Sequence, residues 1–96
     1  MNIFDHPIYK IQSVSIIAPY TIEVTFDNLE KRIINLSEIL HGEIYGPLKD
    51  KSVFNQVKVD EEVNTIVWPN GADFDPAILY DWENCKGELI ELTKSW

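Results

Sequence analysis

Two aspartates in a turn-rich stretch, Asp73 and Asp75, are the first candidates for chemistry in this sequence. General acid–base catalysis uses carboxyl groups whose surroundings hold their pKa values apart. Residues two positions apart in a loop are expected to point to different sides, and no histidine or nucleophile lies near them in the sequence. We therefore expect no catalytic residues and interpret the chain as a non-enzyme.

The two histidines and the single cysteine do not form a metal-binding or nucleophilic pattern. His6, His41 and Cys85 show none of the spacings, such as C-x-x-C or H-x-x-x-H, that place several ligands on one ion. Glu83 and Glu88 stand near Cys85 and should raise the pKa of its thiol. His41 precedes Gly42 at the expected end of a short helix, where a protonated imidazole favours the helix dipole. We expect no metal and no cofactor.

The densest motif is WPNGADFDP, residues 68–76, followed by a Leu-Tyr pair at 79–80. A structural interpretation explains it: Asn70-Gly71 forms a tight turn, Asp73 or Asp75 caps a helix, and Trp68 fills the core. The alternative is a recognition loop that offers an aromatic anchor and polar contacts at a rigid edge. The candidate binding residues of that alternative are Trp68, Asn70, Gly71 and Asp73 of the loop, with Tyr80 and Trp82 of the helix that follows.

This motif resembles a small bacterial family, the domain of unknown function numbered 2442, whose signature is the WPNGAD stretch followed by Leu-Tyr. Upstream features are similar to the family as well: Phe26 to Asn28 as its hairpin, with Leu29 where glycine is common, then Asn35-Leu36, Gly46 to Leu48, Phe54, and Val57 to Val59. The resemblance covers residues 9–82 of a single domain, 1–96, and leaves residues 83–96 as an acidic extension.

The resemblance implies a small α+β domain with no established activity. Members are similar to proteins that are encoded beside another small uncharacterised domain, and this arrangement is interpreted as a toxin–antitoxin pair. Some relatives carry a helix-turn-helix, but this chain has neither the length nor the basic recognition helix for one. The implied role is antitoxin-like contact with a protein rather than binding to operator DNA.

The elements that must position these residues follow from local patterns. Residues 9–17 and 21–26 are expected to be strands, and apolar and polar residues alternate over 21–26. The chain returns through 30–35, which predicts an antiparallel three-strand meander, with Asp27-Asn28 supplying positive φ in its second turn. A short helix is expected to end at Gly42, Gly46-Pro47 should break the chain, and Asp50 should cap a single turn. Strands near 57–59 and 65–68 should pair. Asp75-Pro76 should start a helix that ends before Gly87, and the spacing of the tail is helical.

These elements predict an α+β fold: an antiparallel sheet, made of the meander and a second strand pair, with one short helix and one C-terminal helix packed on it. Ninety-six residues fit one domain, and 45% hydrophobic residues fit a folded one. A single cysteine and no signal-peptide pattern indicate the cytoplasm. No apolar run is long enough for a membrane span.

The net charge of −8 is unevenly distributed, with nine acidic and two basic side chains in residues 60–96. The absence of a basic stripe argues against direct contact with nucleic acid. An acidic surface with aromatic residues favours a basic protein partner. Three hypotheses follow: a non-enzymatic protein-interaction module; a small-molecule-binding domain or minor enzyme using the 68–75 loop; and a homodimer joined through strand edges.

Overall fold

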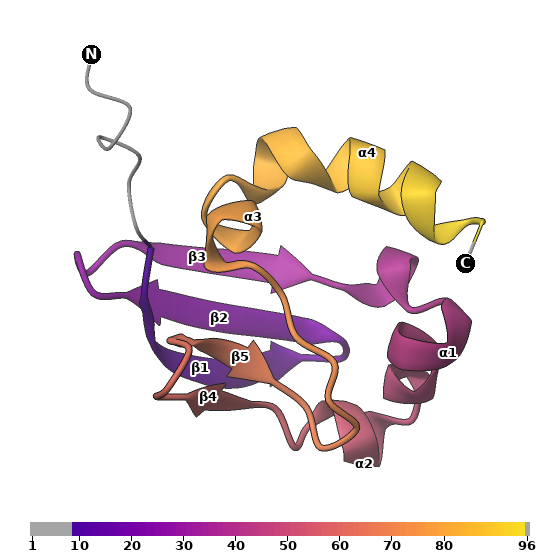
Figure 1. Cartoon of the computed structure of the whole chain (residues 1–96), viewed down its shortest axis with the longest axis horizontal. Helices are drawn as coiled ribbons and strands as arrows, with labels where there is room; N and C mark the ends of the chain where they lie inside the picture. The colour runs from indigo at the N-terminus through magenta and orange to yellow at the C-terminus, as the bar shows by residue number, and fades with distance from the viewer. Residues whose placement is uncertain (1–8, 96) are drawn as a thin grey trace.

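A three-stranded antiparallel meander forms the central sheet of the computed structural model, which describes residues 9–95 (Figure 1). Its strands are β1 (Ile11–Ala18), β2 (Thr21–Phe26) and β3 (Lys31–Asn35), in the order β1-β2-β3. Ile22, Val24 and Phe26 are fully buried, whereas the residues between them are half-exposed. The predicted meander is confirmed, because alternation gives the sheet one apolar face and one wet face.

The second hairpin turn differs from the prediction at the residue that carries the positive φ. Asp27-Asn28 was expected to supply it, but Leu29 does, with φ 71°. The Leu29 amide donates to the Phe26 carbonyl, and the Phe26 amide donates to the Glu30 carbonyl. This arrangement puts the left-handed conformation on the residue after the tight turn, a position that usually holds glycine.

The segment between β3 and β4 is a chain of short helical turns. They are η1 (Ser37–Ile39), α1 (Gly42–Tyr45), η2 (Gly46–Lys49) and α2 (Lys51–Phe54). Gly42, with φ 81°, starts α1 instead of ending a helix, and Gly46-Pro47 continues the helical path into η2. His41 therefore precedes a helix, so the expected benefit from a C-terminal dipole does not apply. The Asp50 carboxylate accepts from the Ser52 amide, which confirms the predicted cap.

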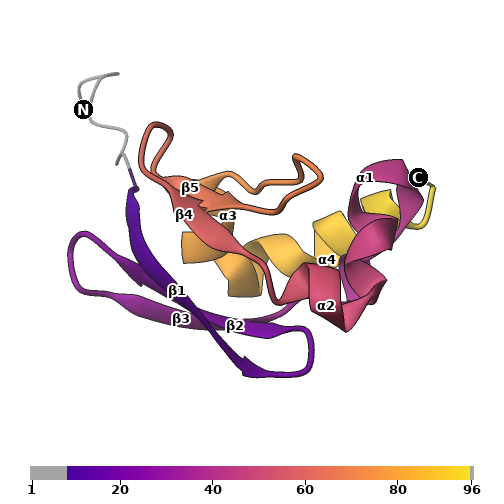
Figure 2. The ribbon, with the colours of Figure 1, turned by 90° about the horizontal axis from the view of Figure 1, so that it is seen from below.

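The second strand pair, β4 (Lys58–Asp60) and β5 (Thr65–Val67), is antiparallel as predicted. The amide of Ile11 donates to the carbonyl of Asn64 at 2.9 Å, which ties the turn of this pair to the start of β1. Figure 2 shows the pair stacked on the β1 side of the sheet. Ile66 is fully buried between the two layers.

The helical C-terminal part of the chain is broken at a different residue from the one predicted. Asp75 caps α3 (Pro76–Tyr80) as expected, but the chain leaves helical geometry at Asp81 (φ −105°, ψ 36°) and restarts as α4 (Trp82–Thr93). Gly87, the expected end, lies inside α4. Both helices lie along the β3 side of the sheet (Figure 1).

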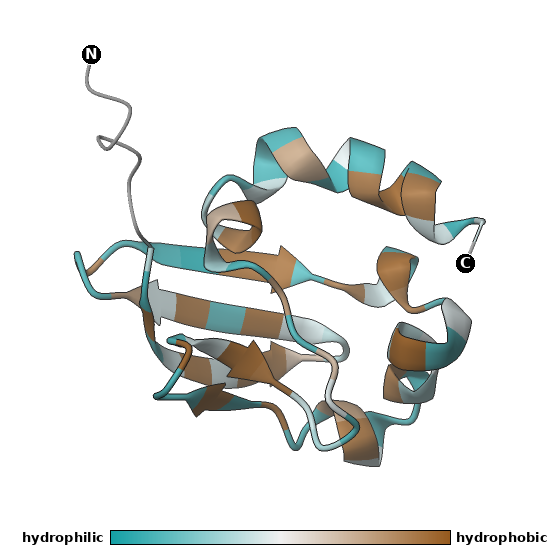
Figure 3. Ribbon diagram, in the orientation of Figure 1, coloured by the Kyte–Doolittle hydropathy of each residue, from teal (hydrophilic) through white to brown (hydrophobic). Residues whose placement is uncertain are grey.

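One apolar core joins these elements. It includes Phe26, Ile34, Phe54, Trp68 and Leu79, all 2% exposed or less. Apolar residues also colour the C-terminal half of α4 in Figure 3, where Leu92 is exposed. No helix within residues 9–95 is both long and apolar enough to cross a bilayer.

Candidate interaction site

Trp68, the first residue of the WPNGAD motif, belongs to the core. Its side chain is 2% exposed, and its indole N–H donates to the Phe54 carbonyl at 2.9 Å. The ring also packs edge-on against Phe74, with centroids 5.8 Å apart. A buried indole with a satisfied donor fixes α2 against β5 and offers nothing to an outside partner.

Asn70 and Gly71 form a turn whose polar groups are used inside the chain. The Gly71 amide donates to the Trp68 carbonyl, the Trp68 amide donates to the Ala72 carbonyl, and φ of Gly71 is 89°. The Asn70 side chain accepts from the Ala72 amide at 3.1 Å and donates to the Ile44 carbonyl at 2.7 Å. The loop thereby holds α1 against the end of β5.

Asp73 adds a second link between this loop and α1. The Tyr45 hydroxyl donates to the Asp73 backbone carbonyl at 2.6 Å, and the Tyr45 ring stacks on Phe74 with centroids 5.0 Å apart. Burial raises the pKa of the Tyr45 phenol, and the nearby Asp73 carboxylate raises it further. The Asp73 side chain itself is exposed. The motif thus joins elements that lie far apart in the sequence.

Tyr80, the fifth candidate residue, lies in a separate cluster beside β3. Its ring stacks on Tyr9, with centroids 4.0 Å apart, and meets Phe26 edge-on. The Arg32 guanidinium lies 4.3 Å above the Tyr80 ring centre, and its Nε donates to the Tyr80 carbonyl at 2.8 Å. These contacts fasten α3 to β3, so the structure does not bring Tyr80 to the WPNGAD loop.

Trp82, the last candidate residue, lines two neighbouring hollows on the molecular surface. One hollow, of about 250 Å³, lies where β3 meets the junction of α3 and α4, and the other, of about 270 Å³, lies between β3, η1 and α4. Both are lined by Ile33, Trp82 and Glu83. We call the combined feature the β3–α4 groove; its other lining residues are Thr21, Arg32, Asn35, Glu38, Ile39, Tyr80, Asp81, Lys86 and Ile90.

An exposed isoleucine lines both hollows of the β3–α4 groove. Ile33 is 63% exposed, whereas its neighbour Ile34 is 1% exposed, because adjacent strand residues face opposite sides of the sheet. Trp82, 6% exposed, lines both hollows together with it. A large aliphatic side chain beside a hollow lined by an indole can receive an apolar group from another molecule.

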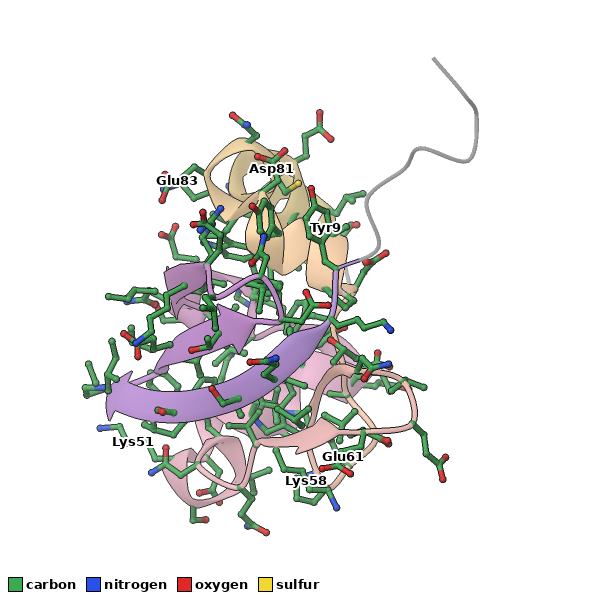
Figure 4. All side chains as sticks on the ribbon, turned by 90° about the vertical axis from the view of Figure 1, so that its left-hand side faces the viewer. Tyr9, Lys51, Lys58, Glu61, Asp81 and Glu83 are labelled. Atoms are coloured by element: carbon green, nitrogen blue, oxygen red, sulfur yellow. The ribbon has the colours of Figure 1, made fainter. Side chains whose placement is uncertain are left out.

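Charged side chains border the β3–α4 groove, and its two cations are already paired. The Lys86 ammonium lies 3.0 Å from the Glu83 carboxylate, and Arg32 lies 3.3 Å from Glu30. Asp81 and Glu38 have no ion pair with any residue in the range 9–95. Figure 4 shows Asp81, at the junction of α3 and α4, and Glu83, on α4, on the opposite side of the sheet from Glu61 and Lys58. The expected single acidic surface is therefore divided between the β4–β5 turn and α4.

The residues considered for catalysis, Asp73, Asp75 and Cys85, have separate places in the structure. The Asp75 carboxylate accepts a hydrogen bond from the Ala77 amide at 2.9 Å and so caps α3. The Asp73 side chain is exposed to solvent.

Partial burial raises the pKa of the Cys85 thiol, and Asp81 and Glu88 add to that shift. The predicted direction is confirmed, with Asp81 acting in place of Glu83. Residues 9–95 contain no cluster of three or more His, Cys, Asp and Glu side chains that could hold a metal.

Sequence reasoning found Trp82 but missed most of its surroundings. Ile33, Glu38, Lys86 and Ile90 come from β3, η1 and α4, and only the fold brings them together. One signal was present: in the pair Ile33-Ile34, a strand with one buried face must turn one isoleucine outward.

The fold and the groove define a small α+β domain in which a helix stands beside the edge of an antiparallel sheet. The chain belongs to the family described as "Protein of unknown function (DUF2442)", whose model matches residues 11–84. This match confirms the resemblance carried by the WPNGAD motif, and it ends within the first turn of α4. Neither the curated proteins nor the solved structures include a match to this chain.

Proposed function

We propose that this domain is a non-enzymatic protein-interaction module whose contact surface is the β3–α4 groove. The observation that carries the proposal is the exposed Ile33, which lines two hollows together with Trp82. Anchors of protein interfaces are typically apolar or aromatic side chains in pockets with a polar rim, and this groove supplies both parts. We place the module in the cytoplasm, where its single cysteine stays reduced.

The family's implied arrangement supports an antitoxin-like role, in which the groove contacts a small protein encoded beside this one. The alternative, a small-molecule site or minor enzyme at the 68–75 loop, has less support. Trp68 and Asn70, two of its polar side chains, already use their donors on Phe54 and Ile44.

An affinity capture with a matched pair of variants tests the proposal. The tagged domain is used as bait in its native lysate and with the co-expressed neighbouring protein, and mass spectrometry identifies what is retained. Ile33→Asp should abolish capture, because it places a charge on the lining of the groove. Ile17→Asp is the control, since Ile17 is an exposed isoleucine of β1, on the opposite edge of the same sheet.

The outcomes test the interaction function separately from the choice of the β3–α4 groove as its surface. A stoichiometric protein retained by the wild type and by Ile17→Asp, but lost with Ile33→Asp, supports both. Equal capture by all three forms would contradict the choice of the groove. A bait that retains no protein in either setting would contradict the interaction function.

A further inference from the structure

The free edge of β3 exposes backbone hydrogen-bonding groups inside the β3–α4 groove. The Phe26 amide donates to the Glu30 carbonyl and the Leu36 amide donates to the Tyr20 carbonyl. Bonded and non-bonded pairs alternate along an antiparallel ladder. Arg32 and Ile34, which face Val24 and Ile22, therefore bond to β2.

The residues between them direct their N–H and C=O groups away from β2. The Lys31 carbonyl is occupied, because it accepts from the Arg32 side chain at 2.8 Å. The outward groups of Ile33 and Asn35 have no hydrogen-bond partner among residues 9–95. Both residues line the groove. An edge strand with free donors and acceptors is a template for another extended chain.

The helix beside this edge limits what can pair with it. α4 provides the opposite wall through Trp82, Glu83, Lys86 and Ile90, and Figures 1 and 4 both show it beyond β3. A second copy of this chain would bring another α4 and another set of rim carboxylates to the same place. A single extended segment needs much less space and can bond to β3 on one side while its side chains meet α4.

The charges of the rim indicate the character of that segment. Lys86 and Arg32 are engaged in ion pairs within the chain, whereas Glu38 and Asp81 have no basic partner among the described residues. The Asp81 carboxylate accepts one hydrogen bond, from the neutral Asn84 side chain at 2.8 Å, and keeps its charge without a counter-charge. Ile33 offers an apolar contact between them. A segment with an apolar side chain flanked by lysine or arginine complements this pattern.

We propose that the β3–α4 groove binds its partner by strand addition: an extended segment with alternating apolar and basic residues pairs with the free edge of β3 at Ile33 and Asn35. This inference rests on the proposed interaction function and specifies how the groove is used. It predicts that affinity depends on the backbone of Ile33 as well as on its side chain.

The test uses the whole chain and a fluorescein-labelled octapeptide that alternates valine and lysine. Binding is followed by fluorescence anisotropy, and amide shifts of Ile33 and Asn35 are followed by NMR. Ile33→Pro removes an outward N–H and leaves the bonds of Arg32 and Ile34 to β2 in place; Ile33→Ala keeps that N–H and loses the side chain. A peptide N-methylated at alternate residues tests the same bonds on the unaltered protein.

Strand addition predicts saturable binding of the basic peptide with shifts at both amides. The affinity should fall at least about tenfold with Ile33→Pro or with the N-methylated peptide, and less with Ile33→Ala. Equal affinities for Ile33→Pro and Ile33→Ala, together with equal affinities for the two peptides, would overturn it. No shift at Ile33 and Asn35 at millimolar peptide would overturn it as well.

Two further outcomes address the occupant. Equal binding of a valine–glutamate peptide would overturn the basic character of the segment. Shifts of the Ile33 and Asn35 amides that depend on protein concentration alone would show that a second copy occupies the edge. If capture of a partner still depends on Ile33→Asp while strand addition fails, the interaction function stands and only its mode is wrong.

Discussion

At the scale of single residues, the WPNGAD motif connects parts of the chain through side chain to backbone hydrogen bonds. Trp68 reaches Phe54, and Asn70 reaches Ile44. Each bond spans elements that local sequence patterns do not pair. A motif with this role sets the geometry of the fold, so its variants should change stability before they change any binding.

Asn70 in the WPNGAD turn and Asn28 in the β2–β3 turn provide a matched test of that role. Asn70→Asp loses the donor to the Ile44 carbonyl and places a carboxylate against it, so the free energy of unfolding should fall by about 1–2 kcal/mol. Asn28 accepts from the Glu30 amide much as Asn70 accepts from Ala72, but its own donor lies 3.4 Å from the Tyr80 hydroxyl. Asn28→Asp should therefore change stability by less than about 0.5 kcal/mol. Equal losses in urea denaturation would show that the link to Ile44 contributes nothing.

Tyr45 gives the same loop a measurable pH dependence. Its pKa in the folded chain is raised above the ordinary value of 10.0 by burial and by Asp73. The folded state therefore binds the phenolic proton more tightly than the unfolded state does, and stability from this group is present below pH 10 and lost as the pH rises through the folded pKa. Tyr45→Phe removes this contribution. The difference in unfolding free energy between the two proteins should shrink above that pH, and a constant difference would contradict the assignment.

At the scale of elements, the β2–β3 turn and the WPNGAD turn have the same hydrogen-bond pattern. They differ in the residue at the left-handed position. Gly71 adopts φ 89° without a Cβ, whereas Leu29 adopts φ 71° with its side chain 76% exposed. Leu29→Gly should raise the free energy of unfolding by about 0.5–1 kcal/mol, because little packing is lost and the strain is removed. Gly71→Leu should lower it by about 1 kcal/mol or more. A stability loss for Leu29→Gly in thermal unfolding would show that the leucine makes a contact that outweighs its strain.

The same scale shows why strands were predictable from the sequence and helix ends were not. In β2, alternation of buried and exposed residues follows from the period of the strand itself, so the meander could be placed correctly. Gly87 suggested a helix end because glycine is a weak helix former. The actual break is at Asp81, whose carbonyl accepts from the amides of Asn84 and Cys85. The helix continues past Gly87 because Leu89, Ile90 and Thr93 pack against the rest of the chain.

At the scale of the whole molecule, the site depends on which elements become neighbours. The sequence placed Tyr80 and Trp82 beside the WPNGAD loop, since they follow it by a few residues. In the fold, the end of α3 and the start of α4 lie beside β3, where Arg32 binds Tyr80 and Ile33 lines a hollow together with Trp82. Strand order and helix placement are set by packing across the entire core, so no local pattern could have predicted the groove.

The part of α4 beyond the family match supplies one wall of that groove, which leads to a prediction about truncation. A chain that stops after Asn84 keeps the strands and the matched residues but loses Lys86, Ile90 and the fully buried Thr93. Its free energy of unfolding should fall by about 2–3 kcal/mol, because apolar contacts with η1 are removed. Binding of the partner or of the valine–lysine peptide should weaken even though the edge of β3 is intact.

A chain that stops after Thr93 is the matched control, since it keeps both the contacts with η1 and the wall of the groove. It should match the full chain in urea denaturation and in peptide affinity. If the shorter chain binds as tightly as the control while unfolding at lower urea, α4 supports the fold alone, and the edge of β3 binds without it. If the two truncated chains are equally stable, the packing of Thr93 and Ile90 does not stabilise the domain.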